Sequence, residues 1–415
     1  MALIHQHRFD NGLWLLAEPV PSAQSLAMSV LLPAGVAAEP DQKQGLGSVL
    51  SEMIFRGAGG LDARAHSDAL DQLGIQRSAG VQSIHLSLSA TMIGAKQIEA
   101  LPLLLDMVRA ANLETSALEP SRDLALQSLE ALDDEPQDRV FVELRRRHFP
   151  SPLGRCHLGR RTDLEAMDLD DVRSYYEDRF VPDGAVLGFA GCFDFEKLKD
   201  LVEARLGDWQ GRGGEPVSSN GAPRGYEHYE AESTQVHIGL AYDALPEPDE
   251  QSILQHAAVA LLSGGMSARL FTEVREKRGL CYAVYASYVG YRDRGVVLGY
   301  AGTTVPRAQE TADVLIAELH RLAEGFEPDE FERAIVGMKS RLVMQGESTS
   351  ARARAIALDQ YLYGRPRPLE ELAAKVDAVT VDRLRRFVAE SPPGPMTVVT
   401  IGPEALEVEG GQGSE

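Results

Sequence analysis

Hydrophobic side chains recur with a helical period over residues 45–57, in the segment GLGSVLSEMIFRG. Apolar residues at i, i+3, i+4, i+7 and i+8 predict one amphipathic helix with a single apolar stripe (Leu46, Val49, Leu50, Met53 and Ile54). A second face of this helix carries Ser48, Ser51 and Glu52. The pattern therefore predicts a helix that packs by its stripe and presents three polar side chains at i, i+3 and i+4.

The two halves of the chain show the same order of strand and helix patterns. The first half begins with the strand patterns LWLLAEPV and SLAMSVLLPAG, and the second begins with QVHIGLAYDAL. Helical patterns follow in each half, and an apolar strand closes it at Gly191 or Gly402. Pro120 and Pro328 both fall in the first turn of a predicted helix. Their separation along the chain is nearly the same as that between Gly191 and Gly402. We infer a duplicated domain.

Strand patterns mixed with runs of helices predict the α+β class, as two homologous domains that each pack helices on a mostly antiparallel sheet. Residues 211–225, GRGGEPVSSNGAPRG, are rich in Gly, Pro and Ser and show no apolar period. They predict a linker between a first domain, 1–210, and a second domain, 226–408. Residues 409–415 are expected to form a flexible tail.

Charge and cysteine content limit the classes of partner that the chain is expected to bind and the cellular compartment in which it is expected to occur. The chain has 41 basic and 62 acidic residues, a net charge of −21, which argues against nucleic acid or an anionic membrane as a partner. Its three cysteines form no CxxC pair, which favours a reducing compartment. No window approaches the roughly 18 apolar residues of a membrane span, and the N-terminus has no signal-peptide pattern. We expect a soluble, cytoplasmic protein.

The segment 45–57 resembles the zinc-binding segment of the M16 (insulinase, or pitrilysin-like) peptidases, whose inverted motif HxxEH lies in a frame like GxAHFLEHMxFRG. The first glycine, the apolar stripe and the closing FRG are similar. The resemblance places Ser48 at the first His, Ser51 at the general-base Glu and Glu52 at the second His. It places Ser128 at the third ligand and Ser121 at a supporting Glu. It thus implies an M16/LuxS-like fold with a degenerate zinc site.

The residue types at these positions do not suit zinc catalysis. A catalytic zinc takes three ligands from His, Glu, Asp or Cys and keeps a water in the fourth place. Only Glu52 could be such a ligand, and no general base stands beside it. The ten histidines form no HxxH or HxxxH pair. An ordinary core helix with a polar side is the alternative; either way we expect no metal, no cofactor and no independent catalysis.

The second half carries an intact motif at residues 263–291, SGGMSARLFTEVREKRGLCYAVYASYVGY. It predicts a helix that ends at Gly279 and a following strand rich in Tyr and Val. It resembles the second-domain signature of M16 peptidases, GGGMSSRLFxxVREKxGLxYxVxS. In that family an Arg and a Tyr seven residues apart project toward the zinc and hydrogen-bond the substrate carbonyl, and the matching residues here are Arg275 and Tyr282. A capping arginine and a tyrosine in an aromatic cluster are the alternative.

Together these motifs predict a non-catalytic, substrate-binding subunit of a heterodimeric M16-type zinc metallopeptidase. A partner with HxxEH would hold the zinc, and this chain would supply Arg275 and Tyr282 in trans to an extended peptide, bound by strand addition to a sheet edge. The alternatives are a zinc-free structural or scaffold subunit, and a peptide-binding module that acts alone or as a homodimer. The missing ligands disfavour an active homodimeric peptidase.

Overall fold

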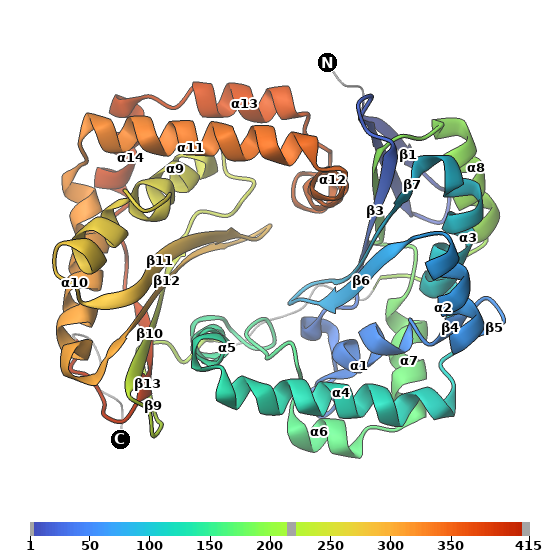
Figure 1. Ribbon diagram of the computed structural model, residues 1–415, viewed down its shortest axis with the longest axis horizontal. Coiled ribbons are helices and arrows are strands. Elements are labelled where there is room, and N and C mark those ends of the chain that lie inside the picture. The colour runs from blue at the N-terminus through green and yellow to red at the C-terminus, as the bar shows by residue number, and fades with distance from the viewer. Residues whose placement is uncertain (1–3, 214–220, 409–415) are drawn as a thin grey trace. The chain divides into compact units, whose positions relative to one another are not determined.

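The computed structural model describes residues 4–213 and 221–408 (Figure 1). They form two compact units, and neither is a contiguous half of the chain. The first holds residues up to 131, 151–213 and 345–368, and the second holds the remainder. The predicted linker, 211–225, lies partly outside the described residues and the predicted tail, 409–415, lies wholly outside them. The domain boundaries at 210 and 226 stay a prediction.

The first unit is built on a six-stranded sheet, antiparallel except where β2 pairs with β8. The strands follow the order β1 (His5–Arg8), β2 (Trp14–Pro19), β8 (Val186–Gly191), β3 (Ser25–Leu32), β7 (Leu86–Ile93) and β6 (Gln76–Val81). A short hairpin joins β4 (Gly57–Ala58) to β5 (Leu61–Asp62). Its helices are α1 (Leu46–Met53), α2 (Ala63–Gln72), α3 (Gln97–Arg109), α4 (Thr115–Asp134), α6 (Arg161–Ala166), α7 (Leu169–Arg179) and α8 (Phe195–Leu206), and α12 (Thr349–Tyr363) joins them.

The second unit is built on a five-stranded sheet, antiparallel except where β13 pairs with β9. The strands follow the order β11 (Cys281–Gly290), β12 (Gly295–Thr304), β10 (Gln235–Ala244), β13 (Thr397–Gly402) and β9 (Tyr226–Glu230). Its helices are α5 (Pro136–His148), α9 (Ser252–Ser263), α10 (Ala308–Arg321), α11 (Pro328–Glu347), α13 (Leu369–Asp377) and α14 (Val381–Glu390). The predicted α+β class, with helices on mostly antiparallel sheets, is confirmed.

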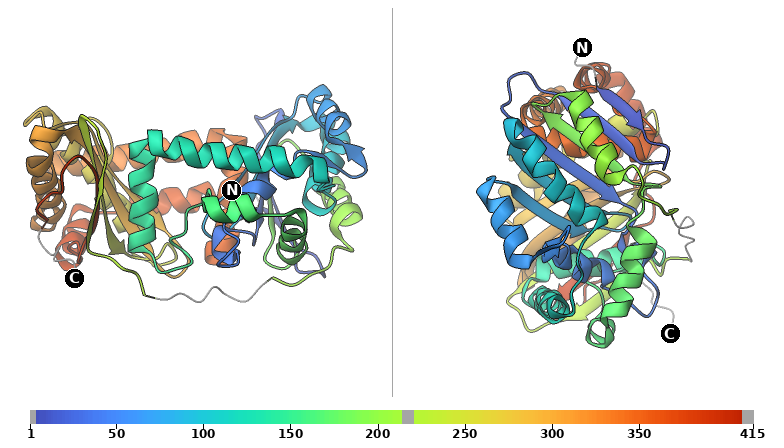
Figure 2. Two further views of the ribbon diagram at one scale, coloured as in Figure 1. Left: turned by 90° about the horizontal axis from the view of Figure 1, so that it is seen from below. Right: turned by 90° about the vertical axis from the view of Figure 1, so that its right-hand side faces the viewer.

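Each sheet is covered on both faces. Neighbouring residues of one strand therefore point into different apolar clusters. In β3, Leu26, Met28 and Val30 join the large core that contains residues of α3 and α8, which lie side by side on one face (Figures 1 and 2). Ala27 points the other way, into a cluster with Ala353 of α12. Burial on both faces explains why these strands consist of near-continuous apolar runs.

The helix on the second face of each sheet comes from the other half of the chain. In the first unit Gly188 of β8 lies so close to α12 that an added Cβ would overlap the carbonyl oxygen of Ala353. Arg352 of α12 is fully buried and donates to Glu18 Oε2 through Nε at 2.8 Å. In the second unit α5 covers β10 and β13, and the buried His148 ring bonds Thr397 Oγ1 through Nδ1 at 3.0 Å. The repeat pattern did not indicate this exchange of helices.

Within the described residues, no helix is both long and apolar enough to cross a membrane.

Candidate functional site

The segment 45–57 forms a shorter helix than the hydrophobic pattern predicts, because α1 ends at Met53. Gly45 precedes it with a φ of +109° and offers no side-chain cap. The buried Glu39 carboxylate caps this end instead, accepting from the backbone N–H of Gly45 at 2.9 Å and of Gly47 at 2.7 Å. Burial raises the pKa of Glu39 to about 7, although both backbone donors oppose the shift.

Two of the three serine hydroxyls at the positions matched to the zinc site bond to carbonyls of their own helices. Ser51 is buried and donates to the Ser48 carbonyl at 2.7 Å, whereas Ser128 of α4 is exposed and donates to the Leu124 carbonyl at 2.9 Å. Ser48 and Glu52 are half-buried. Across the described part of the chain, no three His, Cys, Asp or Glu side chains come together as a metal site. One carboxylate among hydroxyls does not fit a catalytic zinc.

One hydrogen bond joins the two segments that the family resemblance matched to the zinc site. Arg56, just after α1, donates from Nε to Ser121 Oγ at 2.9 Å. Ser121 is fully buried in α4. This bond therefore links the segment after α1 to α4, with Ser121 buried at the position that the resemblance matched to a supporting Glu.

The intact motif contains a π-helical turn, Phe271–Glu276, where the sequence predicted an ordinary helix end. A π-helical turn is wider than an α-helical one and is often found at functional sites. Gly279 then takes a φ of +62°, a left-handed conformation that turns the chain into β11. The predicted helix, glycine and strand are thus all present, in that order.

Both residues of the predicted pair reach solvent. Arg275 is exposed, and its guanidinium lies over the Phe271 ring, 4.7 Å from the ring centre. Tyr282, the second residue of β11, is 45% exposed. Burial raises the pKa of the Cys281 thiol to about 11 and the Arg275 charge opposes that shift, so Arg275 lies near the start of β11. The structure brings the two donors to one turn and strand junction.

Tyr282 has further partners that the sequence did not reveal. Its hydroxyl donates to Gln235 Oε1 of β10 at 2.7 Å. Reaching β10 takes the phenol across the intervening strand β12, over Gly302. Tyr300 of β12 is fully buried, and its hydroxyl lies 2.8 Å from His237 Nδ1. Only the strand register places these residues together, so motif spacing alone could not find them.

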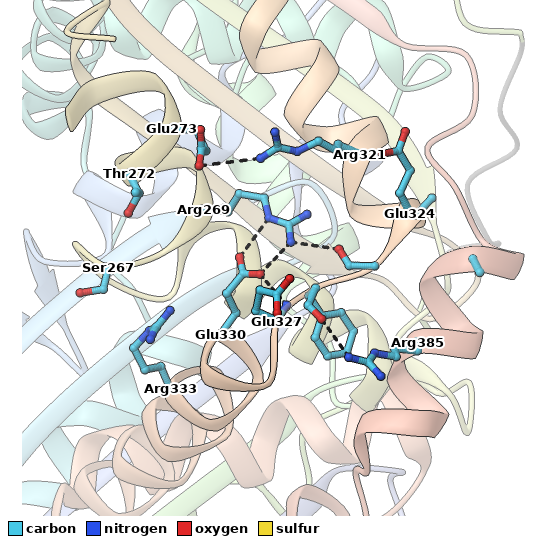
Figure 3. A pocket seen from close by; sticks show the side chains of 14 residues that line it. Ser267, Arg269, Thr272, Glu273, Arg321, Glu324, Glu327, Glu330, Arg333 and Arg385 are labelled. Atoms are coloured by element: carbon cyan, nitrogen blue, oxygen red, sulfur yellow. Dashed lines mark hydrogen bonds and ion pairs between the residues drawn. The ribbon is translucent and has the colours of Figure 1, made fainter. Parts of the chain in front are cut away.

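A network of charges anchors the π-helical turn to the rest of the second unit (Figure 3). Arg269, just before the turn, is buried and donates to both oxygens of Glu330 on α11, at 3.0 and 2.9 Å, and to the Gly325 carbonyl at 3.0 Å. Within the turn, Glu273 accepts from Lys277 at 2.7 Å. Arg269, Glu273 and Glu330 line a pocket of about 830 Å³, whose walls carry four arginines and four glutamates in all. The balance of charge indicates a structural network.

Two sequence profiles match most of the chain. Residues 15–159 match the insulinase profile of peptidase family M16, and residues 166–338 match the peptidase M16 inactive domain. An uncharacterized zinc protease of Bacillus subtilis is 26% identical over 92% of this chain and 94% of its own length. One of Streptomyces coelicolor is 26% identical over 92% of this chain and 86% of its own length.

Solved structures share the fold over nearly the whole chain. The peptidase M16 inactive domain structure from Pseudomonas fluorescens superposes with a TM-score of 0.88 at 18% identity, covering 98% of this chain and 99% of that one. A protease from Helicobacter pylori gives a TM-score of 0.86 at 17% identity, covering 97% of this chain and 100% of that one. At such identities the likeness concerns the fold.

Proposed function

Because the chain belongs to peptidase family M16, we propose that it is the non-catalytic, substrate-binding subunit of a heterodimeric zinc peptidase of this family. One contrast carries the proposal: three of the four positions matched to the zinc site hold serines, two of them bonded to their own helices, whereas Arg275 and Tyr282 are present and exposed. The two donors lie at one turn and strand junction, next to the charge network that holds Arg269, and this supports a role in binding a peptide.

The two donors suit the carbonyl of a peptide held in a chamber between the two subunits. Arg275 is permanently charged and Tyr282 offers one rigid O–H. In the proposed complex the partner's HxxEH segment would hold the zinc, and the metal would supply an activated water for hydrolysis of the peptide. Preorganised donors aimed at the resulting oxyanion are worth about 2–4 kcal/mol each. This chain's contribution is to bind, orient and stabilise charge.

The test is co-expression with an M16 homologue that carries HxxEH. The purified complex should hydrolyse an internally quenched peptide and lose that activity to a chelator. Arg275→Ala or Tyr282→Phe should lower kcat about 30- to 1000-fold while the heterodimer survives gel filtration. Arg386→Ala, an exposed arginine on α14, and Tyr285→Phe, whose hydroxyl accepts from Gln137, serve as matched controls.

Two results would count against the proposal. Zinc-dependent hydrolysis by this chain alone would refute the non-catalytic role. A fully active complex with both substitutions would refute the role in trans and would leave a zinc-free structural subunit as the better account.

A further inference from the structure

The hydroxyl of Tyr282 already donates a hydrogen bond to a group that is chemically similar to the carbonyl of a peptide substrate. A phenol has a single hydrogen to donate, and here it goes to the side-chain amide oxygen of Gln235 at 2.7 Å. That oxygen is a carbonyl of an amide, the same group as the carbonyl of a peptide bond. Tyr282 cannot donate to Gln235 and to a substrate carbonyl at the same time.

Glycine at position 302 makes this arrangement possible. A Cβ added there would lie 2.7 Å from Tyr282 Oη and 2.8 Å from Cζ, and 2.8 Å from Tyr300 Oη. Gly302 lies within β12, outside the left-handed region of backbone conformation. Its role is therefore one of space. The missing side chain leaves a slot, the space above Gly302, in which the Tyr282 phenol crosses over β12.

The side chains beside this slot are buried and held in place. Tyr300 is fully buried and His237 is 95% buried, and the hydrogen bond between them holds the Tyr300 hydroxyl beside the slot. Burial chiefly, and then the nearness of Tyr282, raises the pKa of Tyr300, so its phenol stays neutral. Gln235, by contrast, is exposed at the first position of β10 and is free to turn toward solvent. The movable member of the group is the glutamine.

We propose that Gln235 is a positioning residue that acts as a stand-in for the substrate carbonyl: it holds Tyr282 ready to donate, and the carbonyl of the bound peptide displaces it. This inference rests on the proposed function, because it assumes that Tyr282 donates to substrate. The glutamine then has two opposite effects, ordering the donor and competing with substrate for its only hydrogen.

The competition sets an order among variants. Gln235→Leu removes the acceptor while keeping a similar size, so KM of the co-expressed complex for the quenched peptide should fall about 2- to 10-fold, the equivalent of one neutral hydrogen bond, with kcat within about twofold. Gln235→Glu offers a charged, stronger acceptor, so KM should rise by a similar factor. Gln251→Leu, at another exposed glutamine of this unit, is the control.

A second measurement reads the phenol itself and needs no partner. The full chain labelled with 3-fluorotyrosine gives ¹⁹F resonances for its 12 tyrosines, and Tyr282→Phe identifies the one of interest. Gln235→Leu and Gln235→Glu should move that resonance in opposite directions.

A third test uses the complex again. Gly302→Ala should displace the ring and lower kcat of the complex as Tyr282→Phe does. Gly80→Ala, at a strand glycine with nothing within 4 Å of an added Cβ, should not.

The outcomes separate the two proposals. If Tyr282→Phe lowers activity but Gln235→Leu leaves KM unchanged or raises it, the stand-in role is overturned and the proposed function holds. If an active complex tolerates both Tyr282→Phe and Arg275→Ala, the proposed function itself is overturned, and the stand-in role with it. A KM order of Leu, Gln, Glu from lowest to highest, with the matching ¹⁹F shifts, supports both.

Discussion

Removal of Arg352 should destabilise the first unit far more than removal of any exposed arginine. Its guanidinium is fully buried and meets Glu18, itself 4% exposed, through Nε at 2.8 Å and Nη2 at 2.6 Å. Arg352→Ala leaves a carboxylate buried without its partner, and breaking such a pair costs about 3–5 kcal/mol. Replacing both partners with apolar residues of similar volume is often neutral.

The assay can follow the first unit alone, because both tryptophans of the chain, Trp14 and Trp209, belong to it. Urea unfolding followed by tryptophan fluorescence should show the loss for Arg352→Ala. It should show recovery of most of that loss for the double variant Glu18→Leu/Arg352→Met. Arg354→Ala, at an exposed position of the same helix, should change stability by less than about 0.5 kcal/mol.

Two results would refute this reasoning. A loss below about 1 kcal/mol for Arg352→Ala would show that the pair contributes no more than an exposed salt bridge. A double variant as unstable as the single would show that lost packing, and not the unpaired charge, sets the cost.

Three further predictions follow from the same structure. Glu39 binds its proton more tightly in the folded state, so the free energy of unfolding of the first unit should fall as pH rises from about 4.5 to 7; Glu39→Gln should flatten that slope in tryptophan-monitored unfolding. Burial lowers the pKa of His148 to about 4, so the second unit should lose stability as pH falls from about 6.5 to 4, seen as faster amide hydrogen exchange in β13 relative to the His148→Gln variant. Arg269→Ala should cost the second unit about 2–3 kcal/mol by hydrogen exchange and leave the tryptophan-monitored transition unchanged; a shift in that transition would contradict the placing of Arg269 in the second unit alone.

The sequence predicted those features whose signal is local. Apolar periods indicated strands and helices of the α+β class, and they depend on neighbours within about one or two turns of chain. The resemblance of one short segment to a family signature indicated that Arg275 and Tyr282 belong together near a turn.

The features that the sequence missed depend on long-range pairing. Gln235 lies 47 residues from Tyr282 and meets it only through the order β11, β12, β10. Glu18 lies 334 residues from Arg352. A register shift between Cys281 and Ala283, at the position of Tyr282 within β11, has no signature in the run of Tyr, Val and Ala around it. Such contacts are set by tertiary packing and not by local preference.

The exchange of α5 and α12 has a consequence for the order in which the protein is made. Synthesis proceeds from the N-terminus at about 5–20 residues per second, and domains generally fold as they emerge. The first unit cannot do so, because its sheet lacks α12 until residues 349–363 have left the ribosome. Until then β3 and β8 expose the face that α12 covers, and Glu18 lacks the arginine with which it pairs in the folded protein. The nascent chain therefore carries this uncovered apolar face through most of its translation, and the first unit is completed only after most of the second has been synthesised.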